Sequence, residues 1–92
     1  MDQINYWLVP LSDYAACVDD FDSYIQSKHP PFEEMMVPSG VMREYDDSVF
    51  NDEDLVQLCY ELWEYQRWED IKVVATLACA TNGTHAVVIR SV

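Results

Sequence analysis

The stretch that decides the fold is IKVVATLACATNGTHAVVIRS, residues 71–91. Two apolar runs rich in β-branched residues, 71–80 and 84–91, flank an Asn-Gly pair, which is a strong short-range signal for a β-hairpin. Two registers compete: a two-residue Asn-Gly turn mixes polar and apolar side chains on both faces, whereas Gly83 as a bulge residue gives one apolar face. We favour the bulge register, which puts these side chains on one face: Ile71, Val73, Ala75, Leu77, Cys79, Val87 and Ile89.

Toward the N-terminus, the sequence predicts a strand followed by a helix. The run INYWLV, residues 4–9, is β-branched and aromatic and is closed by Pro10, as expected of a short strand. Ser12 is a suitable N-cap for the helix, and His29-Pro30 ends it because the residue before a proline avoids the α region. Apolar residues at helical spacing form its buried stripe: Tyr14, Cys17, Val18, Phe21 and Ile25.

Residues 30–50 form an irregular connection, because Pro30, Pro31, Pro38 and Gly40 divide them into short pieces. The pattern allows a helical turn or a strand at 32–37, a turn at 38–40 and a short strand at 41–45. A connection of this length in a small domain is either partly ordered or functional.

A second helix is predicted from Asn51, a suitable N-cap, to about Arg67. Asp52, Glu53 and Asp54 fill its first turn, where the helix dipole favours negative charge. Its apolar residues cover an arc of about 220°, wider than one packing face requires. The helix is therefore expected to pack on two sides or to present aromatic surface to a partner.

These elements predict one small α+β domain over residues 1–92. Its antiparallel sheet has about three strands, namely the N-terminal strand and the C-terminal hairpin, and it carries two main helices. The predicted order is β-α-(irregular)-α-β-β. A chain of this length buries only about 60–65% of the surface that its unfolded form exposes, so the core is small.

The charge is strongly negative, with 17 Asp and Glu against 5 Lys and Arg and a net charge of −12. All of the acids lie within residues 1–70, whereas residues 71–92 carry only Lys72 and Arg90. Such a field repels nucleic acid and anionic membranes and attracts basic surfaces. We therefore expect neither direct nucleic-acid binding nor membrane binding.

The cysteines indicate a reducing compartment. Cys17, Cys59 and Cys79 are odd in number and form no CxxC pair, so neither a disulfide framework nor a zinc site is indicated. The N-terminus lacks the basic segment followed by an apolar segment that a signal peptide has. We expect a cytoplasmic protein with reduced thiols.

No pattern indicates catalysis. His29 and His85 have no nucleophile at a suitable spacing, and the two glycines, Gly40 and Gly83, form no phosphate-binding loop. The acidic stretch EYDDSVFNDED, residues 44–54, lacks the glycine and the final glutamate of an EF-hand loop. We expect no enzyme activity, no cofactor and no metal site, although close carboxylates in this stretch leave calcium or magnesium binding as an alternative.

The acidic stretch divides into two parts. NDED, residues 51–54, begins a predicted helix, where the helix dipole favours negative charge. EYDD, residues 44–47, has no such local explanation for its acids. Trp68 falls on the polar side of the second helix beside Glu61 and Glu64, the composition of a hot spot that docks on a basic surface. The predicted partner-binding residues are Asp46, Asp47, Asp52, Glu53, Asp54, Glu61, Glu64, Tyr65 and Trp68.

In size, charge and lack of catalytic residues, the whole chain resembles the small acidic inhibitors of nucleic-acid-handling proteins. These include phage anti-CRISPR and anti-restriction proteins, some of which mimic DNA, and the immunity proteins of nuclease toxins. The resemblance implies a non-enzymatic inhibitor bound to the basic surface of a nuclease or a CRISPR- or restriction-type complex. The competing interpretation is an acidic structural or regulatory subunit that binds through the apolar face of the second helix.

Overall fold

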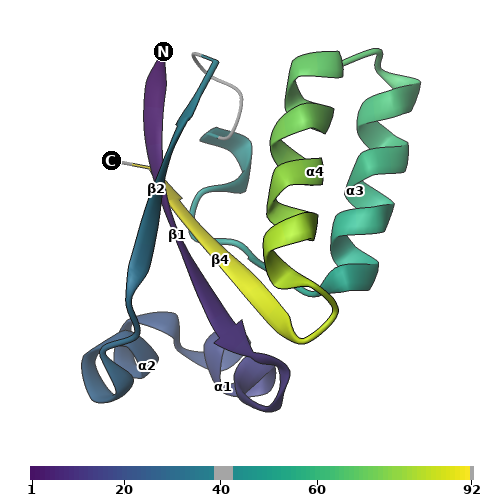
Figure 1. The fold of residues 1–92 in the computed structure, drawn as a ribbon. Helices are drawn as coiled ribbons and strands as arrows, with labels where there is room; N and C mark the ends of the chain where they lie inside the picture. Colours follow the sequence, from purple (N-terminus) through teal and green to yellow (C-terminus); the bar gives the residue numbers. More distant parts are fainter. Residues whose placement is uncertain (39–42, 92) are drawn as a thin grey trace.

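The structure is a computed structural model that describes residues 1–38 and 43–91. Within these residues the fold is α+β, as predicted, with a four-stranded antiparallel sheet in the order β2-β1-β4-β3 (Figure 1). The strands are β1 (Asp2–Pro10), β2 (Phe32–Val37), β3 (Val49–Phe50) and β4 (His85–Ser91). The helices are α1 (Tyr14–Asp19), α2 (Phe21–Lys28), α3 (Asp52–Glu64) and α4 (Trp68–Thr81), with short 3-10 turns η1 (Leu11–Asp13) and η2 (Arg43–Tyr45).

The predicted hairpin is wrong, because residues 71–80 belong to helix α4 rather than to a strand. The buried side chains of α4 are Asp70, Val73, Val74, Leu77 and Thr81, which recur at the three- and four-residue spacing of a helix face. Both registers of the hairpin fail with it. The Asn-Gly pair instead ends the helix: Asn82 has a φ of 49° and donates its backbone N–H to the carbonyl oxygen of Ala78.

Strand β4 follows that turn and lies in the middle of the sheet, between β1 and β3. Its residues Ala86, Val87, Val88 and Ile89 are all buried, because helices cover both faces of the sheet at this strand. The sequence there is continuously apolar, as expected of a strand with two covered faces.

Helices α3 and α4 lie side by side on one face of the sheet (Figure 1). The core between them and the sheet contains Ile4, Val37, Leu55, Leu58, Leu62, Val73, Val74, Leu77, Val87 and Ile89. The second predicted helix is confirmed here as α3. Its N-cap, Asn51, accepts a hydrogen bond from the backbone N–H of Asp54, but the helix ends at Glu64, so Trp68 begins the next helix.

Helices α1 and α2 pack on the other face near one end of the sheet (Figure 1). The ring of Trp7 packs edge-on against Phe21, with 5.3 Å between the ring centroids. The single helix that the sequence predicted is divided at Asp20, which is extended and accepts the N–H of Ser23 to cap α2. Ser12 lies in η1 and caps no helix through its side chain.

The connection at 30–50 is partly ordered, one of the two alternatives that the sequence left open. Residues 32–37 form the edge strand β2, in which Met36 pairs with Gln3 of β1. Of the strand expected at 41–45, positions 43–45 form a 3-10 turn instead, and positions 41–42 lie outside the described residues. The expected turn at 38–40 lies partly outside the described residues.

Candidate functional site

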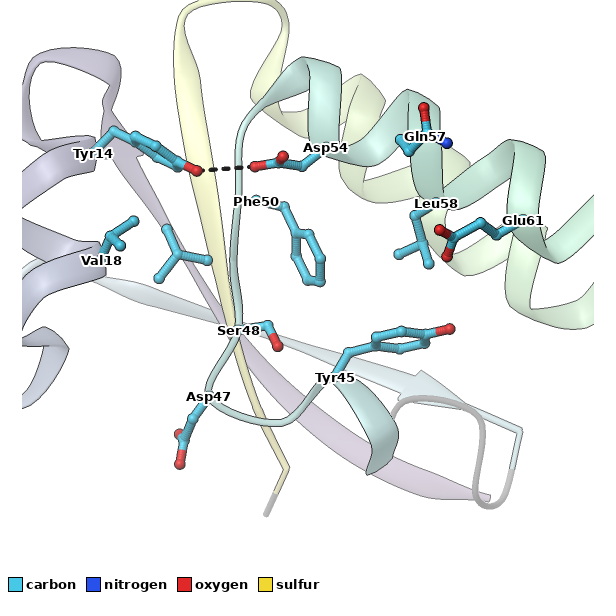
Figure 2. Close-up of a pocket in the computed structure, with 11 residues that line it drawn as sticks. Tyr14, Val18, Tyr45, Asp47, Ser48, Phe50, Asp54, Gln57, Leu58 and Glu61 are labelled. Carbon is cyan, nitrogen blue, oxygen red and sulfur yellow. Dashed lines mark hydrogen bonds between the residues drawn. The ribbon is translucent and has the colours of Figure 1, made fainter.

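A hollow of about 560 Å³ lies between α1, the β3 segment and α3 (Figure 2). We call it the acidic pocket, because three of the predicted site residues, Asp47, Asp54 and Glu61, line it. Its remaining lining residues are Tyr14, Val18, Tyr45, Ser48, Val49, Phe50, Gln57 and Leu58. The pocket therefore combines carboxylates with apolar and phenolic walls. Tyr14 and Tyr45 were not among the predicted site residues. Tyr45 directly precedes the predicted Asp46, whereas Tyr14 is forty positions from Asp54 and reaches the pocket only through the fold.

Asp54 holds the start of α3 in position. It forms a capping box with Asn51: the Asp54 N–H donates to Asn51 Oδ1 at 2.8 Å, and the Asn51 N–H donates to Asp54 Oδ2 at 3.0 Å. The hydroxyl of Tyr14 also donates to Asp54 Oδ2 at 3.0 Å (Figure 2). Burial raises the pKa of Tyr14, and the bond to Asp54 raises it further. Asp54 thus joins α1 to α3.

Asp46 and Asp47 hold the loop before β3 against β4. Asp47 has a φ of 60° and accepts a hydrogen bond from Arg90 Nε at 2.7 Å. Asp46 accepts the backbone N–H of Ser91 at 2.6 Å. The expectation that these two acids have no structural reason for their position is therefore wrong.

Arg90 connects this loop to α2 as well. Its Nη2 donates to Asp22 at 2.8 Å, and its guanidinium lies over the ring of Phe21, 5.2 Å from the centroid. The hydrogen bonds to Asp22 and Asp47 raise the pKa of Arg90. The positive charge of Arg90 is therefore balanced inside the molecule.

Asp52 joins the two long helices. Its Oδ1 accepts a hydrogen bond at 2.9 Å from the hydroxyl of Thr81, which is fully buried at the end of α4. Asp52 thus serves the fold, as Asp46 does.

Glu53, Glu61 and Glu64 differ from the other predicted acids. All three are exposed on α3, and within the described part of the chain none of them has a hydrogen bond or ion pair. On a helix with 100° per residue, Glu64 lies between the side of Tyr60 and that of Glu61, which lines the acidic pocket. Their charges are available to a partner.

The predicted aromatic residues lie at the turn between α3 and α4. Tyr65 is 76% exposed, and Trp68 packs edge-on against Trp63 with 5.0 Å between the centroids. The prediction that Trp68 lies on the polar side of α3 is therefore wrong. Trp68 belongs instead to an aromatic pair with Trp63. The wide apolar arc of this helix led to the expectation of two packed sides or of exposed aromatic surface, and Tyr60 and Trp63 are indeed exposed.

Arg67 forms a second polar cluster near this turn. Its Nη2 is paired with the buried Asp70, and its Nη1 is 3.3 Å from Glu44. Burial raises the pKa of Asp70, and the nearby charge of Arg67 opposes that effect without cancelling it.

We expect Asp70→Asn to remove a pH dependence from the stability of the protein. A raised pKa means that the native state holds the proton more tightly than the unfolded chain, whose Asp pKa is 3.8. Native stability contributed by Asp70 is therefore lost as the pH rises above 3.8 through the higher native pKa. The wild-type free energy of unfolding, minus that of the variant, should fall by on the order of 1 kcal/mol between pH 3.5 and 7.

Urea denaturation across this pH range measures the difference. Asp19→Asn, at an exposed position, removes the same charge and serves as the control. A difference that rises with pH would mean that the pair with Arg67 outweighs burial.

Among residues 1–38 and 43–91, no group of three His, Cys, Asp or Glu side chains is arranged to hold a metal ion. No helix in those residues is long and apolar enough to cross a membrane. Of the predicted site acids, those without a hydrogen bond or ion pair in the described residues are thus Glu53, Glu61 and Glu64 of α3. No protein-family model, no curated protein and no solved structure matches this chain.

Proposed function

We propose that this protein is a non-enzymatic inhibitor that binds a basic, nucleic-acid-handling protein and blocks its nucleic-acid or active site. One observation carries the proposal: the exposed side of α3 presents Glu53, Glu61 and Glu64, which have no cation partner within the described residues. Exposed carboxylates without internal partners are free to pair with the Lys and Arg residues of another protein.

Three of the basic residues, Arg67, Lys72 and Arg90, are already paired with carboxylates of the chain. Arg67 and Arg90 are each held by two carboxylates, and Lys72 lies 3.5 Å from Glu69. The net charge of −12 is therefore not countered by a free positive patch formed by these residues. Such a surface repels nucleic acid and accelerates encounters with basic proteins.

The spacing of the acids favours pairing with individual side chains over imitation of a duplex. Asp54 and Glu61 are two helical turns apart, or about 10 Å. Duplex DNA carries one charge per about 1.7 Å of its axis. The acids of α3 are too sparse for a copy of DNA, but they suit the scattered Lys and Arg residues of a binding cleft.

The partner class follows from the resemblance to small acidic inhibitors: a nuclease, or a CRISPR- or restriction-type complex. We propose that the protein acts in the cytoplasm, where Cys17, Cys59 and Cys79, all unpaired, stay reduced.

Neutralising three acids should weaken binding to the target. We expect Glu53→Gln/Glu61→Gln/Glu64→Gln to raise the Kd about 10- to 100-fold, because paired charges are lost from the interface. The matched control is Asp19→Asn/Glu33→Gln/Glu34→Gln, which removes the same charge at exposed positions away from α3. Affinity capture from lysate with elution by a salt gradient supplies the target, and calorimetry on the purified target measures the Kd.

The proposal also requires inhibition. The captured protein should bind or cleave nucleic acid, and adding this protein should suppress that activity, less so for the α3 variant than for its control. A target without nucleic-acid activity, or equal loss of affinity in both triple variants, would refute the proposal.

The alternative is an acidic structural or regulatory subunit held through the apolar side of α3. It is favoured by the exposure of Val56, Tyr60 and Trp63, which are 55%, 66% and 65% exposed. Salt distinguishes the two: binding through the acids weakens steeply as salt rises, whereas an apolar contact barely changes.

A further inference from the structure

The apolar surface on the solvent side of the α3–α4 pair, around a hollow lined by Cys59, Tyr60, Trp63 and Ile71, is called the apolar groove here. Val56, Tyr60 and Trp63 lie at i, i+4 and i+7 on α3 and therefore form one stripe. On α4, Trp68, Ile71, Ala75 and Cys79 recur at three- and four-residue spacing on the side away from its buried residues, and Ile71 lines the hollow. Helix α3 already buries Leu55, Leu58 and Leu62 against the sheet, so this second stripe is not needed for the core.

The groove contains a hollow of about 230 Å³ lined by Cys59, Tyr60, Trp63 and Ile71. A cavity of about 150 Å³ is enough to hold benzene, so the hollow has room for one large apolar side chain. The contact between Trp63 and Trp68 holds one wall in place. Trp and Tyr have few rotatable bonds, so they bind with a small loss of conformational entropy.

The charges around the groove decide what can occupy it. Glu53 and Glu64 flank the stripe on α3, whereas Glu69 and Lys72 form a neutral pair on α4. A second copy of this chain would bring a further charge of −12 against the same acidic rim. The complementary occupant is apolar toward the groove and basic along the α3 side.

We propose that the groove receives an amphipathic helix of the target protein, with an apolar side chain in the hollow and Lys or Arg residues against Glu53 and Glu64. A helix fits because a groove between two parallel ridges accepts a third helix lying along them. The stripe from Trp68 to Cys79 is about 16 Å long, or three turns of such a helix. This inference rests on the proposed function and names the element of the target that is bound.

The test uses two synthetic peptides of about 18 residues made of leucine and lysine. In one, the leucines recur at i, i+3, i+4 and i+7, and in the other the same residues are scrambled so that no apolar face forms. Calorimetry at 0.15 and 0.5 M NaCl measures their binding to the wild type. We expect the patterned peptide to bind at least about tenfold more tightly than the scrambled peptide at both salt concentrations.

Trp63→Ala should raise the Kd of the patterned peptide at least about tenfold. Met36→Ala, at an apolar residue of β2 that is 55% exposed and does not line the hollow, should change it less than about twofold. Tyr60→Ser is a second groove variant in case Trp63→Ala unfolds, and circular dichroism checks the fold of all three.

Equal binding of the two peptides would overturn the inference, because charge alone would then explain the contact, and so would the absence of binding to either. A dimer in sedimentation that Trp63→Ala disperses would assign the groove to a second copy instead. The proposed function is tested separately, by the identity of the captured target and its activity on nucleic acid.

Discussion

Leu77→Ala is expected to lower the free energy of unfolding by about 3–4 kcal/mol. Leu77 is fully buried where α4 packs on the sheet, in the same core as Val87 and Leu62. Its truncation loses apolar burial and leaves a cavity that the surrounding residues cannot fill. Since small domains are stable by only about 5–15 kcal/mol, the variant should be close to unfolding at 37 °C.

Urea denaturation followed by tryptophan fluorescence and far-ultraviolet circular dichroism measures this change. Thr76→Ala, at the neighbouring exposed position, should shift the free energy by less than about 0.5 kcal/mol. A loss of less than 1 kcal/mol for Leu77→Ala would contradict the packing of α4 on the sheet.

Ala75→Pro is expected to destabilise the protein by about 3 kcal/mol or more. Ala75 is exposed in the middle of α4, so its replacement removes no core contact. Proline lacks the backbone N–H that a helix needs at this position, and its ring meets the carbonyl of the preceding turn. The loss should appear in thermal and urea denaturation.

Ala75→Thr is the control, because a helix and a strand at this position predict opposite changes in the free energy of unfolding. Threonine is a poorer helix former than alanine, so it should cost a few tenths of a kcal/mol in α4, whereas it would favour an exposed strand. Stabilisation by threonine would therefore contradict a helix at 71–80.

The sequence was sufficient to predict those elements whose ends are set by residues close together in the chain. Asn51 was predicted as the N-cap of α3, and Asp54, the residue it caps, is only three positions away. The strand ending at Pro10 was recognisable in the same way. For α4 the local signals conflicted, because Val73, Val74 and the Asn-Gly pair favour a hairpin while the buried positions follow a helical period. Packing on the sheet decided in favour of the helix.

The candidate site could be predicted only in part, because its contacts join distant segments. Asp47 meets Arg90 and Asp46 meets Ser91 more than forty positions further along the chain, so the structural roles of these acids were not readable. The same holds for Tyr14 and Asp54. The wide apolar arc of α3 did indicate that the helix has two apolar sides, and exposed Trp63 lies on the second.

The pairing of β1 with β4 affects how this protein folds. Tyr6 is opposite Ile89, so the central contact of the sheet joins segments about eighty positions apart. Loops of this length close slowly, and proteins dominated by such contacts fold in milliseconds to seconds. Until β4 pairs with it, the inner edge of β1 is exposed to solvent, a state from which chains aggregate. Refolding yield should therefore fall as the protein concentration rises.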